Sequence, residues 1–295
     1  MGSKHEFNGI INVIKPPHMT SHDVVNHIRR KHNIAKVGHT GTLDPMACGL
    51  MTICLGKATK ISEYLLSEDK IYRAEVTFGI KTDTQDIWGN IVEKSEKLPD
   101  EQELMKVMKS FTGKILQKPP MYSAVRHKGK KLYELAREGK TVERKSREVE
   151  IKSLKLINFN GFNATFDVHC TKGTYIRTLC EDIGESLGCG GTMSFLLRIK
   201  SGPFSLTDAV PYDCENINDK IIGIEKALYY FEEMHLDKSF YMRLFNGNTI
   251  KIPLEYEEGD SYKIYSGNEF LGIGKVFSAD RKNNFEFVKI DKLLV

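Results

Sequence analysis

A single carboxylate, Asp44, stands in a glycine-rich loop over residues 38–51. Pro45 follows it directly, and a residue before proline is pushed away from helical backbone angles, so we expect Asp44 on an extended or turn-like backbone. Such a loop can present one acidic group, as a nucleophile or a base, from a rigid scaffold. An ordinary turn with a solvated aspartate fits the spacing equally well, because most glycine-rich loops have no function.

The segments around this loop have the patterns of regular elements. An apolar run predicts a buried strand at residues 50–55, and a helix is expected at 58–66. Upstream, a strand is expected at 9–14, and Thr20 and Asp23 have the spacing of a capping box at the start of a helix. The loop is therefore expected to lie between buried elements.

The rest of the chain mixes strands and helices. Strands are expected at residues 71–80, 90–93, 149–159, 164–170 and 195–199, and helices at 100–111 and 172–187. Strands outnumber helices and the hairpin signals favour antiparallel pairing, so the pattern predicts an α+β fold. Beyond residue 235, short strand-like runs between Gly or Asn turns predict a small β-rich domain.

Positive charge is concentrated in one segment. The chain has a net charge of +4, whereas residues 126–148 alone hold nine Lys or Arg against four Glu. A local positive field attracts polyanions, and phosphate backbones are the commonest target. A solvated, salt-bridged helix face is the alternative, and Leu132, Leu135 and Ala136 do give a short helical stripe.

Two other kinds of site do not fit. Residues 49–57 have the glycines and lysine of a phosphate-binding P-loop, but six residues separate Gly49 from Gly56 where four are needed. His18 and His22 are four residues apart, but His18 precedes the expected helix and no Glu accompanies the pair, so we expect no metal.

Cysteine usage and hydropathy indicate the cellular location of the protein. The chain has 295 residues, enough for one large or two smaller domains, and its six cysteines form no C-x-x-C pair, so reduced thiols are expected. We find no apolar stretch of signal-peptide length at the start and none near the ~18 residues of a membrane span. A cytoplasmic location without membrane contact is expected.

The glycine-rich loop and five later segments resemble, in order, the TruB family of bacterial tRNA pseudouridine synthases, which act on uridine 55. The later segments are Lys70-Ile71-Tyr72-Arg73-Ala74, Thr82-Asp83-Thr84-Gln85-Asp86, Pro119-Pro120-Met121-Tyr122-Ser123-Ala124, Gly129-Lys130-Lys131-Leu132-Tyr133-Glu134 and Lys172-Gly173-Thr174-Tyr175-Ile176-Arg177. The resemblance implies a pseudouridine synthase fold, a long mixed and mainly antiparallel sheet, over residues 1–235. It also implies a basic RNA-contacting arm near 119–148 and a PUA-like module at 236–295.

The resemblance also implies individual roles. Asp44 is expected as the nucleophile and Arg177 as the cation that favours its charged form. Tyr72 is expected to stack on the target base and is a candidate to handle the C5 proton. Substrate contacts are expected from His39, Lys60, Asp86, Tyr175 and Leu196, and RNA contacts from Arg126, Lys128, Lys130 and Lys131.

The implied reaction moves ribose C1′ from N1 to C5 of the same uracil, so no redox equivalent, phosphate donor or metal is formally needed and no cofactor is expected. The carboxylate can attack C6, attack C1′ or act as a base on the ribose; all three routes stay open. The uridine must leave its stack in the T-loop of tRNA. We assume a monomer, since no self-association pattern stands out.

Two rival functions remain open for such a sequence. A non-catalytic RNA-binding protein on the same fold should have lost Asp44, which is present with its neighbours. A phosphotransferase that forms an aspartyl phosphate usually needs magnesium and a second nearby acid, and the segment from Thr42 to Pro45 offers no second acid.

Overall fold

The computed structural model describes residues 7–253, 255–280 and 285–295. The expectation about a signal segment falls largely on residues 1–6, which lie outside the described residues. Within the described part of the chain, no helix has the length and apolar character needed to cross a membrane. The thiols of Cys48, Cys54, Cys170, Cys180, Cys189 and Cys214 are all free.

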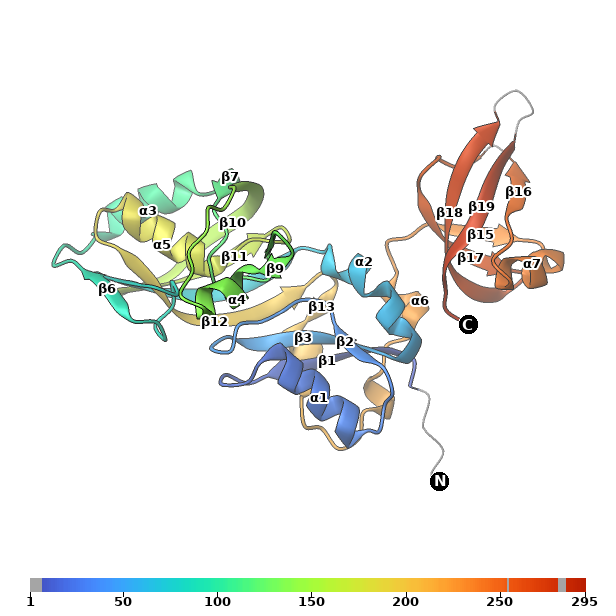
Figure 1. Ribbon diagram of the computed structural model, residues 1–295, viewed down its shortest axis with the longest axis horizontal. Coiled ribbons are helices and arrows are strands. Elements are labelled where there is room, and N and C mark those ends of the chain that lie inside the picture. Colours follow the sequence, from blue (N-terminus) through green and yellow to red (C-terminus); the bar gives the residue numbers. More distant parts are fainter. Residues whose placement is uncertain (1–6, 254, 281–284) are drawn as a thin grey trace.

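A ten-stranded sheet forms the body of the molecule (Figure 1). Its strands are β1 (Gly9–Lys15), β2 (Val37–His39), β3 (Cys48–Leu55), β4 (Lys70–Phe78), β7 (Gly113–Gln117), β10 (Arg147–Phe159), β11 (Asn163–Cys170), β12 (Gly191–Ser201), β13 (Phe204–Ser205) and β14 (Val210–Pro211). The order is β14-β1-β3-β12-β4-β11-β10-β7, with β2 beside β3 and β13 beside β12. The β1–β14 and β3–β12 pairs are parallel and the other neighbours antiparallel, so the predicted mixed, mainly antiparallel α+β sheet is confirmed.

Helices bury their apolar sides against this sheet. Those of the body are α1 (Ser21–Lys31), α2 (Ser62–Leu66), α3 (Glu101–Ser110), α5 (Ile176–Ser186) and α6 (Ile224–Ala227). The predicted capping box is present at α1, where the Thr20 side chain accepts from the Asp23 amide. Leu179 and Ile183 of α5 join Leu104 of α3 in the core over β4 and β11.

Two local expectations need correction. The helix expected at residues 58–66 begins earlier as a 3-10 helix, η1 (Gly56–Ile61), and only then becomes α2. The Thr59 hydroxyl donates to the Gly56 carbonyl at 2.8 Å, which occupies an acceptor that a regular α-helical turn would use. Strand β7 was not predicted, because it is a short sheet-edge strand whose Leu116 is 74% exposed.

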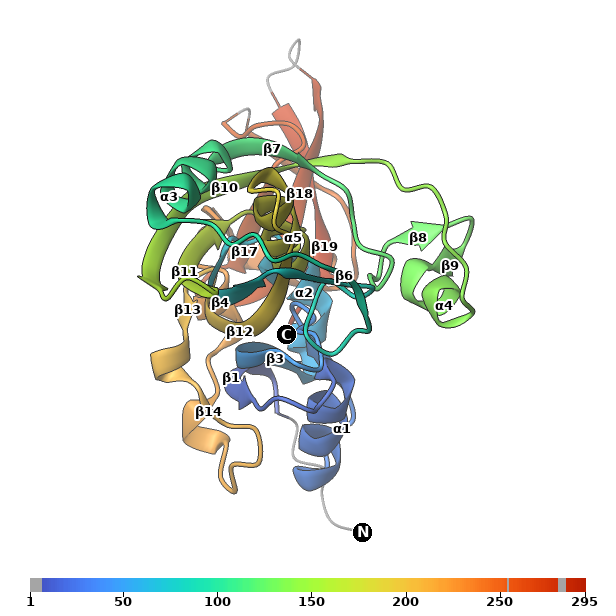
Figure 2. The same ribbon diagram turned by 90° about the vertical axis from the view of Figure 1, so that its left-hand side faces the viewer.

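The basic arm leaves the sheet between β7 and β10 (Figure 2). It carries the two-stranded ribbon of β8 (Arg126–His127) and β9 (Lys130–Lys131), followed by α4 (Leu132–Arg137). The helical stripe expected from Leu132 and Leu135 is therefore real, and both side chains are buried. A second two-stranded ribbon, β5 (Ile80–Thr82) with β6 (Ile91–Lys94), follows β4.

A separate five-stranded sheet forms the C-terminal part (Figure 1). Its strands are β15 (Glu233–Leu236), β16 (Ile250–Pro253), β17 (Ser261–Ser266), β18 (Glu269–Asp280) and β19 (Phe285–Leu293), and α7 (Tyr241–Phe245) accompanies them. Ile273 and Leu294 pack with Ile10 and Leu228 in one buried cluster. The predicted β-rich region thus has its own sheet and one apolar contact with the body.

Candidate active site

Buried neighbours fix the loop that carries Asp44. Leu43 and Ala47 are 2% and 0% exposed and belong to the main core. The Ser21 hydroxyl accepts from the Leu43 amide at 2.8 Å and donates to the Leu43 carbonyl at 3.0 Å. The Asp44 side chain between these anchors is 32% exposed. The loop is therefore held rigidly by buried neighbours and presents one accessible carboxylate, and it is not an ordinary solvated turn.

Arg177, on the first turn of α5, contacts both oxygens of this carboxylate. Its Nε lies 2.9 Å from Asp44 Oδ2, and its Nη2 donates to Asp44 Oδ1 at 3.3 Å. The Arg177 side chain is only 5% exposed. A two-point contact of this kind sets the orientation of a carboxylate as well as its charge.

The remaining guanidinium N–H groups contact two other segments. Nη1 donates to the Thr84 carbonyl at 3.0 Å and lies 3.5 Å from Asp86 Oδ2, while Nη2 donates to the Tyr122 carbonyl at 2.8 Å. Asp86 is buried, and burial raises its pKa while Arg177 opposes the rise. Arg177 therefore joins the Asp44 loop, the turn after β5 and the start of the basic arm.

Tyr72 and Leu196 come from the neighbouring strands β4 and β12. The Tyr72 ring is partly buried, and burial raises the pKa of its phenol, with Asp44 adding to the rise and Arg198 opposing it. Leu196 is 5% exposed in the same core cluster. These side chains give the region around Asp44 an aromatic ring and an apolar surface, the groups that a nucleobase needs.

His39 and Arg198 stabilise the start of the loop. Arg198 on β12 is 2% exposed, and it donates to the carbonyls of Leu50 at 2.7 Å and Gly41 at 3.1 Å. His39 Nδ1 accepts from the Gly41 amide at 3.2 Å. Burial, with Arg198 next in importance, lowers the pKa of His39, so its imidazole is neutral near pH 7.

Gly49 allows β12 to approach β3. Its φ is +105°, and an added Cβ would lie 2.5 Å from the Arg198 carbonyl. The positive φ of Gly49 therefore serves the close packing of these two strands.

Tyr175 positions the start of α5. Its amide donates to Gln117 Oε1 at 2.7 Å, and its carbonyl accepts from Gln117 Nε2 at 3.0 Å. The Arg147 guanidinium lies over the Tyr175 ring, 4.9 Å from its centroid. This contact orients the helix end that carries Arg177.

Lys15 is a fully buried cation beside the loop. Its Nζ donates to the carbonyls of Met19 at 2.6 Å, Pro16 at 2.8 Å and Pro45 at 3.4 Å. Burial lowers its pKa to about 8. Lys15 thus connects the end of β1 to the residue that follows Asp44.

The structure does not bring every expected residue to this group. Lys60 lies beyond the far end of β3 from Asp44, and its Nζ donates to the Leu293 carbonyl of the C-terminal sheet at 2.7 Å. The cations of the arm are on a projecting ribbon (Figure 2). There, Lys131 and Arg137 lie 5.4 and 5.6 Å from the ring centroid of Tyr133.

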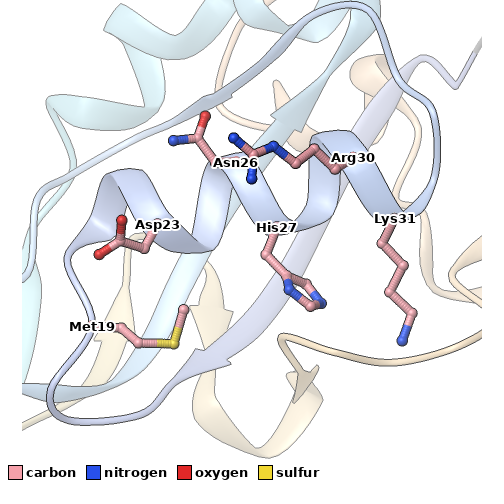
Figure 3. Close-up of a pocket in the computed structure, with 6 residues that line it drawn as sticks. All are labelled: Met19, Asp23, Asn26, His27, Arg30 and Lys31. Atoms are coloured by element: carbon pink, nitrogen blue, oxygen red, sulfur yellow. The ribbon is translucent and has the colours of Figure 1, made fainter.

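A separate hollow lies along α1 (Figure 3). It is lined by Met19, Asp23, Asn26, His27, Arg30 and Lys31. None of these is an expected site residue, and Asp23 is already bonded to Thr20 in the helix cap.

Three contributors to the site were missed from the sequence: Lys15, Arg198 and Gln117. A signal existed for two of them. Side chains two residues apart point to the same face of a strand. Lys15 therefore shares the buried face of Ile11 and Val13 in β1, and Arg198 shares the buried face of Leu196 in β12. Gln117 had no such signal, because β7 was not expected.

Two family models match this chain. The family model described as the N-terminal domain of TruB family pseudouridylate synthases matches residues 29–176. The model described as the tRNA pseudouridylate synthase B C-terminal domain matches residues 177–236.

Two named relatives span nearly the whole chain. The tRNA pseudouridine synthase B of Alkaliphilus oremlandii is 46% identical over 97% of this chain and 98% of its own length. That of Clostridium kluyveri is 42% identical over 96% of this chain and 99% of its own length.

Solved structures share the fold. The Cbf5 complex with Nop10 and Gar1 matches with a TM-score of 0.75 and 28% identity, over 99% of this chain and 86% of that one. An H/ACA ribonucleoprotein bound to a substrate RNA containing 2′-deoxyuridine matches with a TM-score of 0.73 and 25% identity, over 97% and 85%.

The fold shared with the solved Cbf5 structures and the named relatives make this chain a pseudouridine synthase, an enzyme of the isomerase class. The chain belongs to the TruB family of pseudouridylate synthases. The family resemblance noted in the sequence is confirmed.

Proposed function

We propose that this chain converts uridine 55 in the T-loop of tRNA to pseudouridine, with Asp44 as the nucleophile. The observation that carries the proposal is the two-point contact of Arg177 with Asp44 at 2.9 and 3.3 Å. Arg177 is buried while the carboxylate stays partly open, so the anion is oriented and still reachable by a substrate. Support also comes from the relatives' name, tRNA pseudouridine synthase B.

The reaction is an internal transfer. The bond between C1′ and N1 breaks, a bond between C1′ and C5 forms, C5 loses a proton and N1 gains one. Asp44 serves by attack on C6, by attack on C1′ or as a base on the ribose, and each route divides one difficult step into easier ones. No electron leaves the uridine, so the proposal includes no cofactor.

The surrounding residues receive matching roles. Tyr72 stacks on the everted uracil and is the candidate to handle the C5 proton; burial raises the pKa of its phenol. Leu196 forms an apolar wall, and His39 packs against the RNA. Asp86 and Tyr175 contact the substrate, and they also support the site within the protein, since Asp86 lies 3.5 Å from Arg177 Nη1 and the Tyr175 amide donates to Gln117.

RNA binding involves the outer parts of the chain. The arm residues Arg126, Lys128, Lys130 and Lys131 contact phosphates, and Lys60 contacts RNA near the junction with the C-terminal sheet. We assign residues 1–235 to the catalytic domain and 236–295 to a PUA-like domain, although strand β15 already starts at Glu233. The enzyme is proposed to act as a monomer in the cytoplasm.

The product position tests this function. A tRNA transcript is treated with the protein, labelled with carbodiimide, which retains its adduct on pseudouridine, and read by primer extension. We expect one new stop adjacent to position 55, and none in a transcript with cytidine there. Stops at other uridines with none at 55 would contradict the T-loop assignment, and RNA binding with no stop anywhere would favour a non-catalytic protein.

A further inference from the structure

Two exposed aromatic side chains stack on each other near the active site. The rings of His18 and Trp88 have centroids 4.9 Å apart and planes inclined by 20°. Trp88 is 50% exposed, His18 is also exposed, and the neighbouring Ile87 is 46% exposed. None of the roles proposed above uses these residues.

Each ring is connected to one half of the central ion pair. The His18 amide donates to the carbonyl of Pro45, the residue after Asp44, at 2.8 Å. The Trp88 amide donates to Asp86 Oδ1 at 3.1 Å, and Asp86 Oδ2 lies 3.5 Å from Arg177 Nη1. Hydrogen bonds therefore connect His18 to the Asp44 loop, and they connect Trp88 to Arg177 through Asp86. The two stacked rings thus lie beside the Asp44 carboxylate.

The backbone keeps these rings in place at strained positions. His18 has φ +67°, and Gln85, in the turn that leads to Trp88, has φ +65°. Residues with a Cβ rarely adopt these angles, and where they do the strain often marks a functional site. An imidazole thus occupies a backbone position that glycine would adopt more easily.

We propose that His18 and Trp88 form a platform on which an RNA-loop base next to the everted uridine stacks. This inference rests on the proposed function. A uridine that leaves its stack exposes the π-faces of its neighbours, and an exposed indole offers a flat apolar face to one of them. The second ring holds the indole in a fixed plane. The platform recognises bases by stacking and accepts any base.

Kinetics with full-length tRNA test the platform, using tritium release from uracil C5. Stacking on one aromatic ring predicts that Trp88→Ala raises KM about 5- to 150-fold while kcat changes little. Trp88→Phe keeps a π-face and should stay near the wild-type KM. The control is Phe162→Ala, since Phe162 is 61% exposed at the β10–β11 turn, about 20 Å along the strands from Tyr72.

His18→Gly separates binding from structure. Glycine accepts the positive φ, so a purely structural ring contact predicts an unchanged KM. The platform predicts a raised KM with an unchanged melting temperature. A KM for Trp88→Ala and His18→Gly within about twofold of wild type, or an equal rise in Phe162→Ala, would overturn the proposal.

Fluorescence gives a second measurement that does not depend on turnover. Trp88 is the only tryptophan in the chain, so its emission reports this place alone. In Asp44→Asn, saturating tRNA should quench and shift the emission, and unchanged emission would overturn the platform. If wild-type protein releases no tritium, the proposed function fails, and the quenching experiment still decides whether the platform binds RNA.

Discussion

The Arg177 guanidinium joins segments that are far apart in the chain. Its partner Asp44 is 133 residues away, and its other acceptors lie in the turn at Thr84 and at the base of the arm at Tyr122. Removal of one partner from a buried ion pair leaves an uncompensated charge. At the scale of single residues, the site therefore depends on the shape of the cation as well as on its charge.

Arg177→Lys tests this dependence on shape. Lysine keeps the charge but cannot contact both carboxylate oxygens while also reaching the Thr84 and Tyr122 carbonyls. A small displacement of a reacting group lowers the reaction rate strongly, so we expect the single-turnover rate at saturating tRNA to fall about 100-fold. The apparent Kd for tRNA should change much less. A rate within about threefold of wild type would show that charge alone is sufficient.

Lys15 gives stability a specific pH dependence. Its pKa is about 8 in the folded protein, because of burial, and about 10.5 in the unfolded chain. Between these values the unfolded state binds more protons, so the free energy of unfolding rises with pH through this window.

Lys15→Met isolates that dependence, because Lys70, whose pKa burial also lowers to about 8, is present in both proteins. We expect wild-type stability relative to Lys15→Met to rise by about 3 kcal/mol between pH 7.5 and 11, measured by denaturant unfolding. A constant difference over this range would show that Lys15 does not titrate there.

At the scale of elements, the arm and the sheet play different parts. The strands β3, β4 and β12 hold the Asp44 surroundings rigidly, whereas the ribbon of β8 and β9 projects from the body (Figure 2). Some arm charges are already paired, as in the contacts of Lys130 and Lys140 with Glu138 at 3.4 and 2.8 Å. The surplus of positive charge remains available for phosphates.

Neutralising two arm cations should change the salt dependence of activity. In Lys128→Gln/Lys130→Gln we expect the slope of log kcat/KM against log salt concentration to become shallower by about 1.4, as for two phosphate contacts. The matched control is Lys106→Gln/Lys109→Gln on α3, which removes the same charge from an exposed helix face. Equal slopes in both double variants would assign the effect to net charge alone.

At the scale of the whole molecule, the C-terminal sheet contacts the body beside α2 and α6 (Figure 1). Leu294 and Ile273 enter the cluster of the body, and Lys60 and Tyr64 bond to Leu293 and Asp291 at 2.7 and 3.1 Å. The attachment includes η1 and α2, which follow β3, and α6, where the Tyr265 hydroxyl donates to Glu225 at 2.7 Å. The sheet is thus linked to the strand that follows the Asp44 loop.

Leu294→Ala tests this attachment. Leu294 is 6% exposed, and a buried Leu→Ala change costs about 2 to 5 kcal/mol. We expect faster hydrogen exchange in β18 and β19 with little change in β3 and β4, and a kcat close to wild type. Uniformly faster exchange throughout both sheets would show that the two parts unfold as one unit.

Local sequence patterns were enough to predict much of the fold. The cap at Thr20, the apolar run of β3 and the hairpin of the strands expected at 149–159 and 164–170 each depend on neighbours in sequence, and the structure contains all three elements. The Asp44–Arg177 pair came from the family resemblance, because spacing does not reveal contacts over such separations. The alternation of β12 places Arg198 on an inward face, but its role could not be predicted, since its carbonyl partners belong to distant segments.

Tritium release from tRNA labelled at uracil C5 tests the central claim most directly, because that proton must leave when C1′ bonds to C5. Asp44→Asn keeps the size of the side chain but removes its negative charge, and retained tRNA binding will show that the variant is folded. We predict release by the wild-type protein and none above background by Asp44→Asn. Equal release by both would contradict the assignment of Asp44 as the nucleophile.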